Sequence, residues 1–292
     1  MKLAKDIKKV CVVGAGAMGR GIALVAAQAG FDTYITDSFT PSLDAAKAWL
    51  ADYLSGRVAK GKMTKEAADA SASHMFFTSS LEEAATGCDL LIEVIIEDVE
   101  VKRAFFREVD KYVSEDAIVV TNSSSMPSSL FKDSISNPSR LANLHYFNPP
   151  LVMRLNEVVQ GEHTSKETID FLMDYAKLTD KDPIWLRKEI DSFVANRLLA
   201  AMTQEAYRLI EMGICTPEEV DIAAEKGLNH PMGPFKVNDL VGLDVTLKVR
   251  EHMYRESGVK PPAYDILKEK VARGEFGRKA GKGWYDYTKK LA

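Results

Sequence analysis

The first two thirds of the chain alternate short apolar runs with amphipathic segments. Strands are predicted at residues 9–13, 32–36, 76–78, 90–95, 118–121, 140–146, 153–160 and 184–186, and the segment 90–95 is nearly all apolar, as expected for a strand that is buried on both faces. Helical spacing predicts helices at residues 18–29, 80–83, 98–112 and 166–178 and a helical hairpin at 41–72. Strands that alternate with helices are typical of the α/β class. We therefore expect a Rossmann-like, doubly wound, mainly parallel sheet.

Strand signals end after residue 187, and the remaining pattern is helical. Helices are expected at residues 193–212, from Thr216 to Gly227, at 234–256 and at 261–273. Thr216 with Pro217 and Glu219 combines an N-cap, a first-turn proline and a capping-box carboxylate. The pattern predicts two domains, an α/β domain at residues 1–187 and an all-helical C-terminal domain at 188–292.

Composition narrows the function classes. The 292 residues carry a formal net charge of −4, so neither a nucleic acid nor a membrane surface is expected as the main partner. No apolar run reaches transmembrane length, and the first residues carry no signal-peptide core. The three cysteines, Cys11, Cys88 and Cys215, are far apart. These features predict a cytoplasmic protein in a reducing compartment.

A glycine-rich loop follows the first predicted strand. Gly14, Gly16 and Gly19 match G-x-G-x-x-G where a strand ends and a helix begins, and Ala17 and Met18 start that helix. Such glycines allow a tight turn, approach of the backbone to a pyrophosphate at the helix N-terminus, and close packing of the helix on the strand. A plain strand–helix turn is the alternative interpretation.

Asp37 ends the second predicted strand. An acidic residue there accepts hydrogen bonds from a ribose 2′-hydroxyl in dinucleotide-binding folds. Its carboxylate would repel a 2′-phosphate, and no arginine follows it. NAD is therefore expected rather than NADP.

Polar residues follow two further predicted strands, whose carboxyl ends should face the same crevice. Glu97 and Lys102 are expected near the nicotinamide ribose, whereas a solvated acid at a helix start is the favoured interpretation of Glu93. Ser124 lies in a run of three serines after Asn122, where a hydroxyl can bond a substrate oxygen. The alternative is a helix cap, which would need only one of the serines.

His145 ends another predicted strand, and Glu157 can return beside it on the next strand. An imidazole exchanges protons with an alcohol near neutral pH, and a carboxylate partner fixes its tautomer and stabilises its charged form. A purely structural histidine is the alternative. The five histidines of the chain have no metal-ligand spacing, so no metal is expected. Asn196, in the first turn of the helix at 193–212, is either a substrate-bonding amide or a surface amide.

Together these residues resemble the short-chain L-3-hydroxyacyl-CoA dehydrogenases, particularly the bacterial 3-hydroxybutyryl-CoA dehydrogenases. The resemblance covers nearly the whole chain, and its motifs are jointly specific. They are Gly14-Ala-Gly-Ala-Met-Gly-Arg-Gly-Ile-Ala23, Glu93-Val-Ile-Ile-Glu97, Thr121-Asn-Ser-Ser-Ser125, His145-Tyr-Phe-Asn-Pro149, Glu157-Val158, Phe193-Val-Ala-Asn-Arg197, Asn229-His-Pro-Met-Gly-Pro234 and Gly281-Lys-Gly-Trp-Tyr-Asp-Tyr287.

The resemblance implies reversible NAD-dependent oxidation of a (3S)-3-hydroxyacyl-CoA, such as 3-hydroxybutyryl-CoA, to the 3-ketoacyl-CoA by hydride transfer. It implies that His145 is the catalytic base paired with Glu157, and that Ser124 and Asn196 hold a substrate oxygen. The implied cofactor-binding residues are Gly14, Gly16, Ala17, Met18, Gly19, Asp37, Glu97, Lys102 and Asn122.

The resemblance also implies an acyl-CoA partner and a homodimer formed through the helical domain. Lys60 and Lys62 on the hairpin are candidates for contacts with CoA, against the alternative of a solvated charged face. One segment departs from the family, which usually has Asp-x-Pro-Gly where this chain has Lys188-Glu-Ile-Asp-Ser192. Glycine and proline fix backbone turns, so the local geometry or the acyl pocket is expected to differ there.

Two other functions stay open. One is a dehydrogenase of a free 3-hydroxy acid or another 3-hydroxy carboxylate without CoA. The other is a non-catalytic NAD(H)-binding protein, against which the presence of His145, Glu157, Ser124 and Asn196 argues.

Overall fold

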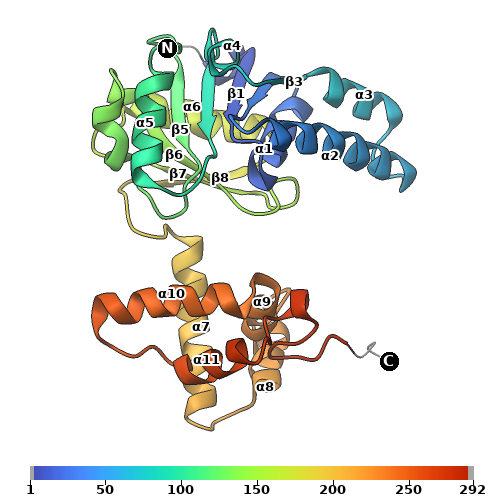
Figure 1. Ribbon diagram of the computed structural model, residues 1–292, viewed down its shortest axis with the longest axis vertical. Helices are drawn as coiled ribbons and strands as arrows, with labels where there is room; N and C mark the ends of the chain where they lie inside the picture. Colours follow the sequence, from blue (N-terminus) through green and yellow to red (C-terminus); the bar gives the residue numbers. More distant parts are fainter. Residues whose placement is uncertain (1–2, 289–292) are drawn as a thin grey trace. The chain divides into compact units, whose positions relative to one another are not determined.

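The computed structural model describes residues 3–288 and contains two compact units (Figure 1). The first unit ends at Phe193 and the second begins at Val194. The boundary predicted after residue 187 lies slightly earlier in the chain. The residues in between pack with the first unit, where Phe193 is buried with Val159 and Leu186.

The first unit is built on one eight-stranded sheet in the order β3-β2-β1-β4-β5-β6-β7-β8. The strands are β1 (Lys9–Val13), β2 (Asp32–Thr36), β3 (Met75–Thr78), β4 (Leu90–Glu93), β5 (Ile118–Thr121), β6 (Leu141–Tyr146), β7 (Leu155–Val159) and β8 (Asp182–Leu186). β1 to β6 are parallel, β7 runs antiparallel to β6, and β8 runs parallel to β7. The predicted Rossmann-like sheet is confirmed. Its strand order reverses between β1 and β4, where a crevice forms at the carboxyl ends.

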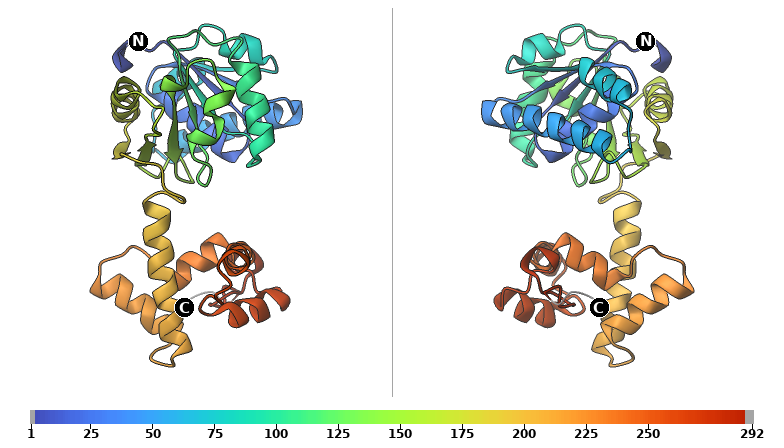
Figure 2. Two further views of the ribbon diagram at one scale, coloured as in Figure 1. Left: turned by 90° about the vertical axis from the view of Figure 1, so that its left-hand side faces the viewer. Right: turned by 90° about the vertical axis from the view of Figure 1, so that its right-hand side faces the viewer.

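The strands serve two cores, one on each face of the sheet. In β1, Val10 and Val12 belong to the core that includes α1 (Ala17–Gln28) and α6 (Lys166–Leu178). Cys11 and Val13 belong to the core that includes α5 (Val99–Val109). Figure 2 shows α5 and α6 on opposite sides of the sheet. Burial on both faces explains why central strands such as β4 and β5 are nearly continuous apolar runs in the sequence.

The remaining helices of the first unit flank the sheet. They are α2 (Thr40–Ala59), α3 (Lys65–Ser73), α4 (Leu81–Ala85) and the short 3₁₀ helices η1 (Ala4–Asp6), η2 (Ser128–Ser134) and η3 (Pro138–Arg140). α2 and α3 form the predicted hairpin, which projects to one side of the sheet (Figure 1). Ser80 caps α4 as predicted, but the capping box is half formed because the Glu83 carboxylate accepts from the Thr78 hydroxyl.

The second unit is helical, as predicted. It contains α7 (Ala195–Glu211), α8 (Pro217–Ile222), the π-helical turn η4 (Ala223–Gly227), α9 (Pro234–Val241), α10 (Leu243–Ser257), α11 (Tyr264–Ala272) and η5 (Arg278–Ala280). Thr216 and Glu219 form the predicted capping box at α8. The single helix predicted at 234–256 is wrong. Gly242, with φ of +110°, separates α9 from α10 because that backbone conformation interrupts a helix.

Two fully buried aspartates organise the second unit. Asp221 accepts hydrogen bonds from the backbone N–H groups of Phe235 and Lys236 in the first turn of α9. Asp239 accepts from the N–H groups of Trp284 and Tyr285. The motif at 281–287 is thus joined to the helical core, and Asp221 fixes the start of the helix that follows the motif at 229–234.

Candidate active site

The glycine loop between β1 and α1 has the backbone geometry that its sequence predicts. Gly14 has φ of +108°, and a Cβ atom on it would lie 2.4 Å from the carbonyl oxygen of Val94. A Cβ atom on Gly19 would lie 1.8 Å from the carbonyl oxygen of Gly14. A Cβ atom on Gly16 would meet nothing within 4 Å. Gly14 and Gly19 are therefore required by packing, whereas the space at Gly16 is open to a ligand.

The start of α1 suits an anion. Gly16 is the N-cap and supplies no side-chain cap, and no acidic residue stands in the first turn. Gly16 and Ala17 are exposed, and Met18 is half-buried. The first N–H groups of a helix lack intrahelical acceptors and lie at the positive end of its dipole. This N-terminus therefore fits a pyrophosphate.

Asp37 is held against the glycine loop. Its Oδ2 accepts from the backbone N–H of Ala15 at 2.8 Å, and its Oδ1 accepts from the N–H of Phe39 at 2.9 Å. The carboxylate is thereby fixed at the carboxyl end of β2, where it repels phosphate and can accept a ribose hydroxyl. This arrangement fits NAD.

Glu93, at the end of β4, lies in a buried ionic cluster. Its side chain has no exposed surface, and Lys102 Nζ lies 2.5 Å from its Oε1. Lys102 Nζ also lies 3.3 Å from Oε2 of Glu97, whose side chain is 45% exposed. Burial raises the pKa of Glu93, and Lys102 opposes that rise. The prediction that Glu93 is a solvated acid is wrong, because its side chain is buried. The sequence does not reveal that Lys102 of α5 is its partner.

The loop after β5 brings Asn122 and Ser124 to the same edge of the sheet. The N–H of Asn122 donates to the carbonyl oxygen of Glu93, and its Oδ1 accepts from the N–H of Tyr146. Ser123 is the serine that stabilises the following turn, since its hydroxyl accepts from the N–H of Met126. Ser124 is half-buried and is not used in that turn.

His145 and Glu157 are paired residues of β6 and β7. His145 Nδ1 lies 2.8 Å from Glu157 Oε2, and both side chains are buried. The predicted return of Glu157 beside His145 on a neighbouring strand is thus confirmed. With Nδ1 directed at the carboxylate, Nε2 is the ring nitrogen that can exchange a proton with a substrate.

Sequence reasoning missed the neighbours that hold His145. The ring centroids of Phe147 and Phe193 lie 4.5 Å and 5.5 Å from that of the imidazole. Asn156 Nδ2 donates to the carbonyl oxygen of His145 at 3.2 Å. Phe147 follows β6 directly and Asn156 lies within β7, so strand pairing is the signal that would have found them. Phe193 is the last residue of the first unit, and no local sequence pattern indicates its contact with His145.

The other candidate residues lie elsewhere. Asn196 is half-buried in the first turn of α7, within the second unit. Lys60 and Lys62 are exposed at the turn between α2 and α3. Among residues 3–288, no group of three or more His, Cys, Asp or Glu side chains could hold a metal ion. No helix in the same range has the length and apolarity to cross a membrane.

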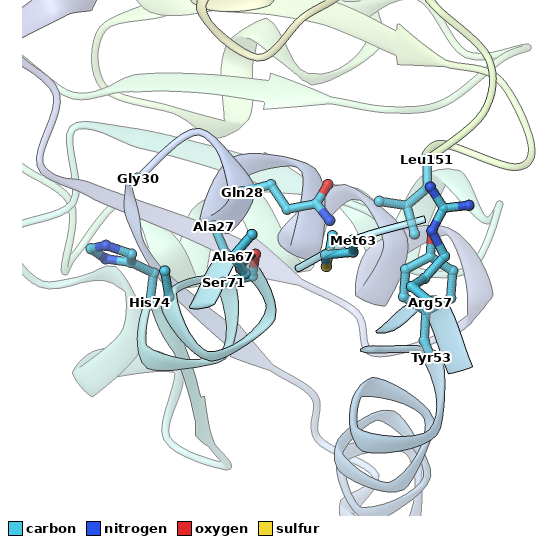
Figure 3. A pocket seen from close by; sticks show the side chains of 11 residues that line it. Ala27, Gln28, Gly30, Tyr53, Arg57, Met63, Ala67, Ser71, His74 and Leu151 are labelled. Carbon is cyan, nitrogen blue, oxygen red and sulfur yellow. Dashed lines mark hydrogen bonds between the residues drawn. The ribbon is translucent and has the colours of Figure 1, made fainter. Parts of the chain in front are cut away.

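A pocket of about 450 Å³ separates the helical hairpin from α1 (Figure 3). Tyr53, Arg57 and Leu151 gather at one end of it, and His74 lies at the other (Figure 3). Its lining includes neither His145 nor the two hairpin lysines. The pocket is therefore distinct from the site of the His145–Glu157 pair.

The dinucleotide loop and the histidine–carboxylate pair stand at one edge of a Rossmann sheet, and together they define an NAD-dependent dehydrogenase. Residues 9–190 match the model of the 3-hydroxyacyl-CoA dehydrogenase NAD binding domain, and residues 193–287 match that of the C-terminal domain of the same enzymes. The chain belongs to the 3-hydroxyacyl-CoA dehydrogenase family, and NAD is its cofactor.

Individual relatives agree with this assignment. The chain is 36% identical to 3-hydroxybutyryl-CoA dehydrogenase of Clostridioides difficile over 96% of its own length and 100% of that protein. The crystal structure of (S)-3-hydroxybutyryl-CoA dehydrogenase from Ralstonia eutropha is similar with a TM-score of 0.87 at 32% identity, covering 97% of this chain and 100% of that one. A diketoreductase that acts on dicarbonyl compounds is similar with a TM-score of 0.86 at 28% identity, covering 98% and 100%.

Proposed function

We propose that this protein catalyses the reversible oxidation of a short (3S)-3-hydroxyacyl-CoA, such as 3-hydroxybutyryl-CoA, to the 3-ketoacyl-CoA. The observation that carries the proposal is the buried His145–Glu157 pair at the end of β6. A buried imidazole that is hydrogen-bonded to a carboxylate is a suitable general base for an alcohol.

In the oxidation, His145 Nε2 takes the proton of the substrate hydroxyl, and in the reduction it returns that proton. Glu157 stabilises the imidazolium formed in the first direction and keeps Nε2 turned to the substrate. Bound NAD supplies the two-electron oxidation of the alcohol carbon. Phe147 and Phe193 cover the imidazole, which limits access of water to the proton transfer.

Ser124 and Asn196 hold the reacting oxygen or the neighbouring carbonyl in this proposal. Ser124 is a half-buried residue in the loop after β5, and β4 is the single strand between β5 and the strand that precedes the glycine loop. Asn196 supplies an amide from the first turn of α7. Orientation of this kind accounts for much of the rate enhancement that general base catalysis does not supply.

The proposed cofactor-binding residues are distributed over the ends of four strands, β1, β2, β4 and β5. Gly14, Gly16, Ala17, Met18, Gly19 and Asp37 would hold the adenosine and pyrophosphate. Glu97, Lys102 and Asn122 would lie at the nicotinamide ribose, in agreement with their position after β4 and β5. Lys60 and Lys62 would meet the phosphates of CoA with their exposed ammonium groups.

The helical residues 188–292 are proposed to cover the substrate cleft and to form a homodimer. Exposed apolar side chains recur on one stripe of α10 at Val245, Val249 and Met253, four residues apart. Leu240 and Val241 add exposed apolar surface at the end of α9. Contiguous exposed apolar surface marks an interaction site. We infer a cytoplasmic enzyme, in agreement with its acyl-CoA substrate.

The proposal is tested by following NADH consumption with 3-ketoacyl-CoAs of increasing chain length, with acetoacetate as the substrate without CoA. Acetoacetyl-CoA should be the better substrate by orders of magnitude, and NADPH should replace NADH poorly. The likeness to the diketoreductase supports one alternative, a dehydrogenase of a 3-hydroxy carboxylate or dicarbonyl without CoA. Faster turnover of acetoacetate would favour it. Tight NADH binding without turnover of any of these compounds would favour a non-catalytic protein.

A further inference from the structure

The carboxylate of Glu93 has more partners than a solvated acid would need. Its Oε1 accepts from Lys102 Nζ at 2.5 Å and from the backbone N–H of Ile95 at 2.8 Å. Its Oε2 accepts from the Thr121 hydroxyl at 2.6 Å. Glu93 has no exposed surface, and Lys102 is 1% exposed. Buried charges are costly unless they are paired and hydrogen-bonded, so the four groups form one built cluster.

This cluster joins two loops at the carboxyl edge of the sheet. On one side, Lys102 reaches Glu97 in the loop between β4 and α5. On the other side, the Thr121 hydroxyl accepts from the N–H of Ser123, which opens the loop that carries Ser124. One buried carboxylate therefore fixes both loops relative to each other.

Lys102 lies between two unequal carboxylates. Glu93 holds its ammonium group at 2.5 Å in the interior, whereas Glu97 approaches it at 3.3 Å and keeps 45% of its side chain exposed. The interior partner fixes the position of the ammonium group. The exposed partner is the carboxylate that can meet a ligand.

We propose that Glu93 is a positioning residue for the cofactor, which fixes Lys102 so that Lys102 holds the Glu97 carboxylate towards the ribose beside the nicotinamide. This inference rests on the proposed place of Glu97 and Lys102 in the cofactor site. Glu93 itself, being fully buried, does not touch the cofactor. Its effect is selective, because the adenosine end of NAD is held by a different loop and by Asp37.

The test compares two ligands in the Glu93→Gln variant. NADH contains the nicotinamide ribose and ADP lacks it, so ADP measures only the site of the glycine loop and Asp37. The variant should bind NADH about tenfold more weakly, the effect of losing one charge-assisted hydrogen bond, and should bind ADP within about twofold of the unchanged protein. NADH fluorescence gives the first dissociation constant, and calorimetry gives the second.

Glu108→Gln is the matched control. Glu108 also pairs with a lysine and accepts from a hydroxyl, at 2.6 Å from Lys111 Nζ and 2.7 Å from the Tyr112 oxygen, but its side chain is 45% exposed at the far end of α5. This variant should bind both ligands as the unchanged protein does.

Two results would overturn the proposal. One is unchanged NADH affinity in Glu93→Gln, and the other is an equal loss of NADH and ADP affinity, which indicates general damage to the fold. Should Glu93→Gln fail to fold, Glu93→Asp retains the charge with a shorter reach, and the same selective loss of NADH affinity is required of it. Both measurements are of binding, so failure of the unchanged protein to reduce acetoacetyl-CoA would contradict the proposed function separately.

Discussion

Glu157 lies directly opposite His145 across the antiparallel β6–β7 pair, with Oε2 2.8 Å from Nδ1 of the imidazole. Successive side chains of a strand point to opposite faces, so a slip of one residue would remove Glu157 from His145. The neighbouring pair, Tyr146 and Asn156, strengthens this register because Asn156 Nδ2 donates to the His145 carbonyl. Strand register therefore decides which ring nitrogen faces the substrate.

Replacement of His145 by glutamine should lower kcat by about 10²- to 10⁴-fold, the usual contribution of a general base. The dissociation constant of NADH should stay within about twofold, since His145 contacts Glu157 and two phenylalanines rather than the glycine loop. Steady-state kinetics and NADH fluorescence measure the two quantities. Near-normal turnover in the variant would remove His145 from the assigned role.

Gly16→Ala should separate cofactor binding from folding. Gly16 has φ of −65° and open space at the Cβ position, so alanine should leave the melting temperature almost unchanged. The added methyl group occupies the approach of the pyrophosphate and should weaken NADH binding by about tenfold or more. Gly19→Ala provides the contrast, because its Cβ would collide with the Gly14 carbonyl and destabilise the fold itself. Unchanged NADH affinity in Gly16→Ala would contradict the assignment of the loop.

Ser192→Gly should stabilise the protein. Ser192 has φ of +62° in the segment where the family usually carries glycine, and a side chain is strained in that region. Its removal should raise the free energy of unfolding by roughly 0.5 to 1 kcal/mol, measured by urea denaturation. Ser55→Gly, at an exposed position within α2, should lower it by about the same amount. A loss of stability in Ser192→Gly would show that the strain is absent.

The stability of the protein should fall in alkaline solution partly because of Cys88. Burial raises the pKa of Cys88 from 9.0 to about 12, and burial also raises the pKa of Cys11. The unfolded chain ionises Cys88 above pH 9 while the folded protein keeps the thiol protonated. The stabilisation is therefore complete below pH 9 and is lost between pH 9 and 12.

At pH 10 this loss amounts to about 1 kcal/mol for Cys88 relative to neutral pH. Urea unfolding of the unchanged protein and of Cys88→Ala at pH 8 and pH 10 isolates the contribution, because the other titrating groups are shared. The variant should show the smaller decrease. Equal decreases in the two proteins would contradict the assignment.

The features that sequence predicts well here are those set by local chemistry. The glycine loop has glycine at three fixed positions. At Gly14 and Gly19 a side chain would approach backbone atoms to less than 3 Å, so the local packing excludes other residues. His145 and Glu157 belong to adjacent strands with a short connection, so their pairing could be expected. The mainly parallel, doubly wound character of the sheet likewise follows from the alternation of strands and helices, although the strand order does not.

The features that could not be predicted from the sequence depend on contacts between residues that are distant in the chain. In the sequence, Glu93 is an acidic residue at the end of a strand. Only the folded structure shows that its two carboxylate oxygens accept hydrogen bonds from Lys102 and Thr121. Phe193 follows β8 and contacts the His145 ring, and no periodic pattern in the sequence predicts this contact. The hydrophobic pattern does not predict that a helix ends at Gly242, because a single glycine within a helical pattern is often tolerated.

The antiparallel return of β7 has a consequence for folding. His145 and Glu157 are only 12 residues apart and meet through a single hairpin, so closure of a small loop is enough to bring them together. The pair proposed for proton transfer thus lies within one short contiguous segment of the chain, whereas the loops proposed to bind the cofactor are scattered over β1, β2, β4 and β5. Formation of the β6–β7 hairpin alone brings the two side chains together, and the cofactor loops require the whole parallel sheet.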